Sequence, residues 1–313
     1  MRYSVVDIGS NTLKMNIYDA EVSAAPALSL VLSESATIGL ISYKNGALMG
    51  DGGIVKLVET LEAFKKLSDN VGSNVFMCYA TASLRFIDNS DEVIRIVRDR
   101  TGIAIDLISG ENEALFGFDG LRWGLGQDVR CGVMADLGGG STELVGFIDG
   151  MAVRAISLSV GCLTLYKKYV GEILPKKQEI KEIRVSVDKS LADIDWLGGY
   201  GDTAYLVGGT ARALGRLHAQ LYPNDRPERG YQMSAEEVGE VAHRLREPGK
   251  KEAELLIRTV PDRLHTIIPG ITVYRRIIKK MGAEKIVISN GGLREGYLLS
   301  RLKNLSAKED NAE

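Results

Sequence analysis

Cysteine, histidine and long apolar runs are scarce in this chain of 313 residues. The three cysteines are scattered and lack Cys-x-x-Cys spacing, so we expect buried free thiols and neither a disulfide framework nor a zinc site. The three histidines occur in neither His-x-His nor His-Glu-x-x-His spacing, which argues against a histidine-built metal site. No apolar run reaches the roughly 18 residues that cross a bilayer, and the N-terminus has no signal-peptide core. We therefore expect a cytoplasmic protein without a membrane partner.

An excess of positive charge is absent too. Lysine and arginine number 39 against 41 aspartates and glutamates, which gives a net charge of −2. A protein that binds a nucleic-acid backbone needs a basic surface, so we expect no nucleic-acid partner. Neither G-x-S-x-G nor G-x-x-x-x-G-K-[ST] occurs, which argues against serine hydrolases and P-loop enzymes. The remaining composition, 45% hydrophobic and 26% charged, is that of a globular protein whose length fits two domains.

A strand, a glycine-containing loop and a second strand occur twice. The first copy passes through DIGSNT (7–12) and the second through DLGGGST (136–142). Apolar and polar residues alternate after each loop, as in a strand, whereas a Rossmann or P-loop element would continue as a helix. The sequence therefore predicts two related hairpins with glycine-rich tips.

Predicted helices and strands alternate through the rest of the chain. Apolar spacing and capping residues predict helices at 53–69, from 90 onward, and at 111–121, 163–170, 180–191, 211–221 and 293–302. Apolar runs predict strands at 75–79, 103–108, 204–207 and 285–288. This alternation in two similar halves predicts an α/β fold with a cleft between two domains.

Composition also suggests where the chain divides. The segment WGLGQDVR (123–130) precedes the second hairpin, so we expect domains of residues 1–125 and 126–305. Polar residues dominate 222–230 and 306–313, which we expect to form a mobile loop and a frayed tail.

The two hairpin tips have the chemistry of a phosphate site. Glycine lets backbone N–H groups converge on one small concavity, and such a nest holds phosphate oxygens. Hydroxyl donors are added by Ser10, Thr12, Ser141 and Thr142. Each loop opens with an aspartate, Asp7 or Asp136, and carboxylates suit Mg²⁺ that is bound partly through water. A single Asp-x-Gly turn is usually only a tight hairpin, but here the pair is joined by Gly208-Gly209 and Gly291-Gly292 at other strand ends.

A hydrolase also needs a base that activates water. Judged on spacing alone, Glu143 is the favoured candidate because it directly follows the second glycine loop. Glu111 and Glu113 follow a predicted strand, but acids are favoured in a first helical turn for electrostatic reasons alone. Arg85 has two interpretations, a bidentate phosphate ligand or an ordinary surface helix residue.

Six motifs together resemble the exopolyphosphatase / guanosine pentaphosphate phosphatase family, in the family's order and across nearly the whole chain. They are DIGSNT (7–12), ATASLR (80–85), ISGENEA (108–114), DLGGGSTE (136–143), GGTARAL (208–214) and SNGGLREG (289–296). The resemblance implies two ribonuclease-H-like domains of the actin-like, sugar-kinase and Hsp70 ATPase superfamily around a central cleft. It also makes the C-terminal helix, from about residue 300, a candidate addition to the first domain.

The resemblance further implies a role for each motif residue. Glu113 matches the catalytic glutamate, and Glu143 matches the second acid, which helps to place water or metal. Asp7, Asp136 and Glu143 are the implied metal ligands, with Mg²⁺ or Mn²⁺ as the cofactor. The implied phosphate-binding residues are Gly9, Ser10, Asn11, Thr12, Lys14, Arg85, Gly138, Gly139, Gly140, Ser141, Thr142, Gly208 and Gly209.

The implied activity is release of terminal orthophosphate from inorganic polyphosphate, with Glu113 as the base. The alternatives are removal of the 5′ phosphate from guanosine pentaphosphate, a kinase on the same fold, and a non-catalytic sensor of alarmone nucleotide or polyphosphate. A homodimer is also implied, because family members often dimerise. Two residues depart from the family pattern: Lys14 stands where arginine is usual, and Asn112 where a second glutamate is common. The chain resembles the short, two-domain form of the family.

Overall fold

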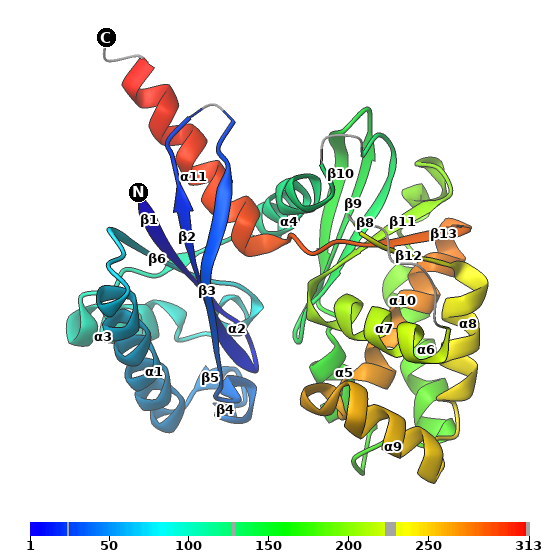
Figure 1. The fold of residues 1–313 in the computed structure, drawn as a ribbon. Helices are drawn as coiled ribbons and strands as arrows, with labels where there is room; N and C mark the ends of the chain where they lie inside the picture. The colour runs from blue at the N-terminus through cyan, green and yellow to red at the C-terminus, as the bar shows by residue number, and fades with distance from the viewer. Residues whose placement is uncertain (24, 127–128, 223–229, 311–313) are drawn as a thin grey trace. The chain divides into compact units, whose positions relative to one another are not determined.

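Two compact α/β units make up the protein. The computed structural model describes residues 1–23, 25–126, 129–222 and 230–310 (Figure 1). One unit comprises Met1–Glu113 and the chain from Tyr297 onward, and the other comprises Ala114–Gly296. The chain passes from one to the other within two helices, α4 (Gly110–Leu125) and α11 (Leu293–Asp310). The domain boundaries predicted at about residues 125 and 305 lie C-terminal to the two points where the chain passes between the units, after Glu113 and after Gly296.

The first unit is built on a five-stranded sheet in the order β3-β2-β1-β6-β7. The strands are β1 (Arg2–Ile8), β2 (Thr12–Ala20), β3 (Leu28–Thr37), β6 (Val75–Ala80) and β7 (Asp106–Leu107). β1 pairs antiparallel with β2 and parallel with β6, as in a hairpin followed by a crossover. The helices are α1 (Asp51–Asn70), α2 (Ala82–Arg85) and α3 (Ser90–Thr101), and the short elements are η1 (Leu40–Ser42), β4 (Lys44–Asn45) and β5 (Leu48–Met49).

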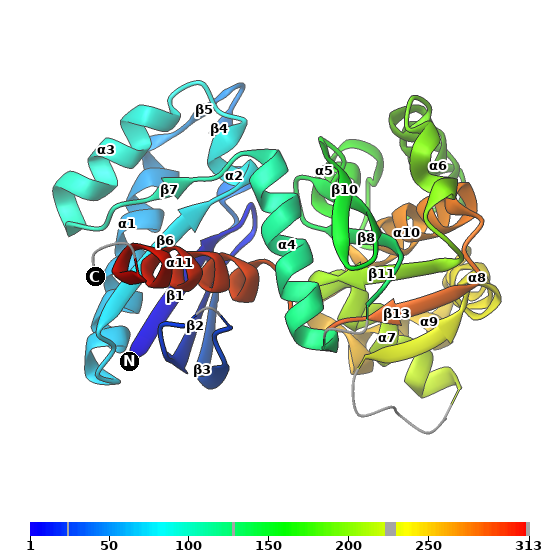
Figure 2. The ribbon, with the colours of Figure 1, turned by 90° about the horizontal axis from the view of Figure 1, so that it is seen from above.

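The second unit repeats this strand order and adds one strand. Its sheet runs β10-β9-β8-β11-β13-β12, and once the edge strand β12 is set aside the order 3-2-1-4-5 of the first unit is repeated. Figure 2 labels β10, β8, β11 and β13 of this sheet. The strands are β8 (Gly132–Leu137), β9 (Thr142–Ile148), β10 (Met151–Leu158), β11 (Thr203–Val207), β12 (Tyr231–Ser234) and β13 (Lys285–Ile288). The helices are α5 (Cys162–Tyr169), α6 (Lys177–Leu191), α7 (Gly208–Leu221), α8 (Ala235–Arg244), α9 (Lys250–Thr259) and α10 (Ile267–Met281), with η2 (Asp195–Gly199) and η3 (Pro261–Arg263).

The predicted duplication and the predicted α/β class are both confirmed. β1–β2 and β8–β9 are antiparallel hairpins whose last paired positions are Ile8 with Leu13 and Leu137 with Thr142. The same offset places Asp7 opposite Lys14 and Asp136 opposite Glu143. In each hairpin a pair of charged residues therefore lies one position before the last paired residues.

Each unit has its own apolar core. In the first, alternate residues of β1 and β2 pack against α1, whose apolar side the sequence predicted. In the second, α10 lies at the centre and packs against α5, α6, α7 and α8. Eleven of its 15 residues are buried, including Gly270 and Tyr274. The sequence analysis did not predict α10, α8 or α9.

Two expected features fall partly outside the described residues. The loop expected at 222–230 includes residues 223–229, and the tail expected at 306–313 includes 311–313; both stretches lie outside the described part of the chain. The last helix continues to Asp310, beyond its predicted end at 302. No helix within the described ranges is long and apolar enough to cross a membrane.

Candidate active site

The first glycine loop is held by its own carbonyl oxygens. The N–H groups of Ile38 and Gly39 both donate to the Asn11 carbonyl, at 3.0 and 2.8 Å, and the N–H of Ile41 donates to the Ser10 carbonyl at 2.9 Å. A Cβ on Gly9 would lie 2.8 Å from the Thr12 carbonyl oxygen, so a side chain there would force the turn open. These hydrogen bonds to the Ser10 and Asn11 carbonyls hold the loop in one conformation.

Polar side chains flank that loop. Asp7, the last but one residue of β1, is paired with Lys14, so the predicted metal ligand and the predicted phosphate ligand lie opposite each other across the hairpin. Burial first, and the Asp7 charge second, raise the pKa of the neighbouring Cys78 thiol, which is therefore not a reactive thiolate. The Thr12 hydroxyl lies 3.4 Å from the hydroxyl of Thr37 on β3.

Arg85 and Glu113 form a buried ion pair. Arg85 ends α2 and Glu113 lies in the first turn of α4, and Arg85 Nη1 donates to Glu113 Oε2 at 2.8 Å. The same nitrogen donates to the Ile108 carbonyl at 3.2 Å. The side chains are only 16% and 9% exposed, whereas Glu111 of the same turn is exposed. Geometry thus separates two acids that spacing alone could not distinguish, and it assigns Arg85 a carboxylate partner that the sequence analysis did not predict.

The second glycine loop is capped by the N-terminus of α5. Backbone N–H groups of Cys162 and Leu163 donate to the carbonyls of Gly138 and Gly139, each at 3.0 Å, and that of Thr164 also reaches Gly139 at 3.1 Å. The loop carbonyls are therefore turned toward a helix N-terminus, where the helix dipole is positive. The N–H groups at the start of α5 thus hold the loop in place.

Gly161 makes that packing possible. A Cβ at this position would lie 2.2 Å from the Gly139 carbonyl oxygen and 2.4 Å from the Gly140 nitrogen. Both obstacles are backbone atoms, which cannot rotate away. Cys162 adds a side-chain bond, because its thiol lies 3.2 Å from the Gly138 carbonyl oxygen.

Two predicted phosphate ligands in this loop are buried. Ser141 is 2% exposed and Thr142 is 1% exposed. The Thr142 hydroxyl donates to the Val160 carbonyl, which occupies the donor that the sequence analysis reserved for phosphate. The assignment of both residues to phosphate binding stays a prediction.

Asp136 and Glu143 lie opposite each other where β8 and β9 meet the loop. Glu143 is 2% exposed, and the Ser157 hydroxyl donates to its Oε1 at 2.7 Å. Asp136 Oδ1 would lie 2.5 Å from a Cβ on Gly208, whose φ of +90° is also unfavourable for other residues. The structure therefore brings together two predicted metal ligands and the predicted third glycine loop.

The donor set of this pair fits a hard divalent cation. Mg²⁺ takes oxygen ligands, usually one or two carboxylates completed by water and substrate phosphates. The paired carboxylates of Asp136 and Glu143 supply that protein share. Among the described residues there is no cluster of three or more His, Cys, Asp or Glu side chains that could hold a metal.

Arginines surround the N-terminus of α7, and the sequence analysis assigned none of them to the site. Arg263 lies over Gly209, with Nη2 2.1 Å from the position that a Cβ would occupy, and its Nη1 lies 3.5 Å from the Thr210 hydroxyl. Arg212 is one turn further along the helix, and burial, followed by the charge of Arg294, lowers its pKa. Arg212 and Arg294 stand inside two motifs quoted for the resemblance, which is the signal that could have found them.

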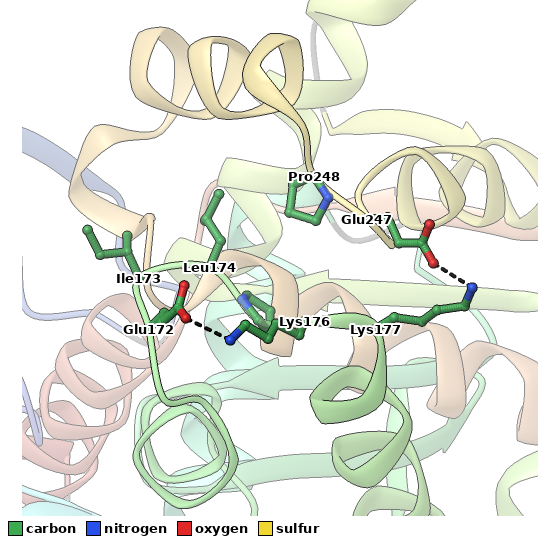
Figure 3. A pocket seen from close by; sticks show the side chains of 8 residues that line it. Glu172, Ile173, Leu174, Lys176, Lys177, Glu247 and Pro248 are labelled. Carbon is green, nitrogen blue, oxygen red and sulfur yellow. Dashed lines mark ion pairs between the residues drawn. The ribbon is translucent and has the colours of Figure 1, made fainter.

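A surface pocket of the second unit shows a different chemistry (Figure 3). Its lining consists of Glu172, Ile173, Leu174, Pro175, Lys176, Lys177, Glu247 and Pro248. Lys176 pairs with Glu172 at 2.7 Å and Lys177 pairs with Glu247 at 2.5 Å, all four side chains being more than half exposed. Both ammonium groups already have carboxylate partners, so this pocket is not part of the candidate phosphate site.

Comparison with known proteins bears directly on this arrangement. A family model described as the Ppx/GppA phosphatase family matches residues 21–305. The chain belongs to this family. The resemblance drawn from the six motifs is thereby confirmed, and the chain is a member of a family of phosphatases. The Asp7–Lys14 hairpin lies N-terminal to the matched residues.

Individual relatives span the chain at modest identity. It is 26% identical over 306 residues to "Exopolyphosphatase 1" of Mycobacterium tuberculosis, a match that covers 96% of this chain and 88% of the relative. It is 28% identical over 308 residues to "Exopolyphosphatase 1" of Mycobacterium leprae, with 96% and 90% covered.

Solved structures of the same family share the fold. The crystal structure of the Aquifex aeolicus Ppx/GppA family member has a TM-score of 0.80 at 24% identity and covers 97% of this chain and 98% of that one. The structure of an exopolyphosphatase from Cytophaga hutchinsonii has a TM-score of 0.85 at 19% identity, with 97% and 98% covered. The predicted actin-like fold class is confirmed.

Proposed function

We propose that this chain is an exopolyphosphatase that releases terminal orthophosphate from inorganic polyphosphate, with Glu113 as the general base. The observation that carries the proposal is the Arg85–Glu113 ion pair, in which a carboxylate 9% exposed is fixed 2.8 Å from a guanidinium nitrogen. A guanidinium has donors that point in several directions, so it can hold a carboxylate and a phosphoryl oxygen together. Arg85 is thereby suited to place a phosphoryl group beside the base.

The reaction then needs one proton transfer and one displacement. Water attacks the terminal phosphorus, its proton passes to Glu113, and the bond from that phosphorus to the bridging oxygen breaks, which leaves the shortened chain as the leaving group. The transferred group carries negative charge, which the Arg85 guanidinium would stabilise. Lys14 adds a cation at the first loop.

A divalent cation completes the proposal. Mg²⁺, or Mn²⁺, would be held by Asp136 and Glu143 of the second unit and would neutralise charge on the phosphate oxygens. The assignment of Asp7 as a further ligand stays a prediction. Ser157 orients Glu143 through its hydroxyl donor at 2.7 Å, so the carboxylate presents a fixed oxygen to the ion.

Phosphate release at fixed protein with Mg²⁺ tests the proposal. The substrates are short polyphosphate, long polyphosphate, guanosine pentaphosphate and ATP. We expect Glu113→Gln to lower turnover of polyphosphate by about 10²–10⁴-fold, the usual contribution of a general base. The matched control is Glu111→Gln, which removes an exposed acid from the same helical turn and is expected to change turnover less than about threefold.

Each other outcome contradicts a specific part of the proposal. Faster turnover of guanosine pentaphosphate than of polyphosphate would replace the substrate and keep the base. Equal losses of polyphosphate turnover in Glu113→Gln and Glu111→Gln would refute the assignment of Glu113 as the base. Binding of polyphosphate without release from any substrate would refute the enzyme and favour a sensor.

A further inference from the structure

Tyr274 of α10 contacts the end of a strand that leads into a glycine loop. Its side chain is 0% exposed, and its hydroxyl donates to the Val207 carbonyl oxygen at 3.0 Å. Val207 is the last residue of β11, and the chain continues directly into Gly208. Helix α10 contains none of the six motifs, so the sequence analysis assigned Tyr274 no role.

The same phenol oxygen also contacts the strand beside β11. Burial raises the pKa of Tyr274, and the charges of Asp136 and then Cys162 add to that effect, while a hydrogen bond with the Leu137 backbone lowers it. A hydrogen bond that lowers the pKa of a phenol stabilises its anion, so the Leu137 N–H is the donor. Since β8 and β11 pair in parallel with Val207 opposite Asp136, one hydroxyl bridges the ends of both strands.

The bond to the Val207 carbonyl also sets the direction of the next peptide N–H. The carbonyl and the N–H of a planar trans peptide point in opposite directions. Because Tyr274 belongs to the apolar core and holds the Val207 oxygen there, the Gly208 N–H points away from that core. Asp136 Oδ1 would lie 2.5 Å from a Cβ on Gly208, so the carboxylate and this peptide are direct neighbours.

Two further carbonyls at the candidate site are held in the same way. The Ser83 hydroxyl donates to the Ile8 carbonyl at 2.5 Å, and the Thr142 hydroxyl donates to the Val160 carbonyl. Each of these carbonyls, like that of Val207, belongs to the residue directly before a glycine. Ser83 and Thr142 are only 5% and 1% exposed, so a buried hydroxyl on the preceding carbonyl is a repeated feature of these loops.

We propose that Tyr274 is a positioning residue of the second unit, which holds the ends of β8 and β11 so that Asp136 can bind a divalent cation. The inference rests on the proposed function only for the cation, and the buried Tyr274 itself touches neither substrate nor metal. Without its hydroxyl, the Val207 carbonyl and the Leu137 N–H both lose a buried partner. The two strand ends can then turn, and the Asp136 carboxylate moves with them.

Binding of Mn²⁺ in the absence of substrate, followed by electron paramagnetic resonance, tests this role. Tyr274→Phe removes only the hydroxyl and keeps the ring, and its dissociation constant for Mn²⁺ should rise about 10–100-fold. The matched control is Tyr166→Phe, which removes a bond of 2.7 Å from a tyrosine hydroxyl to the Glu172 carbonyl. Its affinity should stay within about threefold of the wild type. A merely structural role of Tyr274 would lower stability in urea without a change in Mn²⁺ affinity.

A further pair of variants shows whether Tyr274 acts through Asp136. Asp136→Asn removes the ligand itself, so it should weaken Mn²⁺ binding at least as much as Tyr274→Phe does. The double variant should then bind Mn²⁺ no more weakly than Asp136→Asn alone. A larger loss in the double variant, or an unchanged affinity in Asp136→Asn, would overturn the inference.

The outcomes distinguish this inference from the proposed function. Equal Mn²⁺ affinities of Tyr274→Phe and Tyr166→Phe would overturn the positioning role, whether or not the protein hydrolyses polyphosphate. Absence of Mn²⁺ binding to the wild type would overturn it too, even in a protein that releases phosphate. Weakened Mn²⁺ binding in Tyr274→Phe, in a protein that releases no phosphate from polyphosphate, would support the positioning role and refute the hydrolase.

Discussion

A side chain at Gly161 is expected to displace the second glycine loop. In Gly161→Ala the new Cβ meets the Gly139 carbonyl oxygen at 2.2 Å, its carbon at 2.3 Å and the Gly140 nitrogen at 2.4 Å. Ordinary contacts begin about 1 Å further out, so either α5 or the loop must retreat. That movement breaks the hydrogen bonds from Cys162, Leu163 and Thr164 to the loop carbonyls.

The cost follows from the bonds lost. Three backbone hydrogen bonds at about 1 kcal/mol each give about 3 kcal/mol of lost unfolding free energy. Misplacement of the loop by about 1 Å should also lower phosphate release by about 10²-fold, if the loop binds the transferred group. Both effects arise from one methyl group that touches no substrate.

Urea denaturation measures the first effect and phosphate release the second. Both tryptophans, Trp123 and Trp196, belong to the second unit, so their fluorescence reports on the unit that contains Gly161. The control is Gly199→Ala, where a Cβ meets nothing within 4 Å. A Gly161→Ala protein within about 0.5 kcal/mol of the control, with full turnover, would refute the packing argument.

Three other changes have expected outcomes. Arg85→Ala removes the cation that lies 2.8 Å from the buried Glu113 carboxylate, so we expect about 3–5 kcal/mol of lost unfolding free energy in urea. The double variant with Glu113→Gln should lose less, and a double-mutant cycle that shows no coupling between the two residues would contradict the ion pair. Ser157→Ala removes the donor to Glu143, and the Mg²⁺ concentration for half-maximal release should rise about 10–100-fold; unchanged Mg²⁺ dependence would argue against Glu143 as a ligand. The pKa of Glu237 is lowered, mainly by a backbone hydrogen bond at Ser234, so its stabilisation is present above the unfolded pKa and is lost as pH falls through the folded value. Glu237→Gln should therefore be less stable than the wild type at neutral pH and equal to it in acid, as thermal unfolding at several pH values would show. A difference in melting temperature that grows as the pH falls would contradict this prediction.

The hairpins could be predicted from the sequence because their signal is local. Period-two alternation and a glycine loop occur within about a dozen residues, and the register of β1–β2 and β8–β9 follows from them. Helix α10 was not predicted in this way, since 11 of its 15 residues are buried and its charged residues, Arg275, Arg276, Lys279 and Lys280, occur only in its second half. β3 was missed for the opposite reason, because most of its residues are exposed.

The candidate site, too, could be predicted only in part from the sequence. Motif residues were found because they adjoin glycine loops, but the choice between Glu111 and Glu113 depends on burial, which spacing does not reveal. The Arg85–Glu113 pair and the approach of Arg263 to Gly209 join distant segments, so only the folded chain shows them. Gly208 and Asp136 also come from distant segments, and only the folded chain brings them together.

Hydrolysis in ¹⁸O-labelled water is the most direct test of the central claim, that water attacks the terminal phosphorus of polyphosphate. The protein is incubated with short-chain polyphosphate and Mg²⁺, and the released orthophosphate is analysed by mass spectrometry. The account predicts one ¹⁸O atom in each orthophosphate, with release suppressed in Glu113→Gln. Unlabelled orthophosphate with the label in the remaining chain, or no release at all, would contradict it.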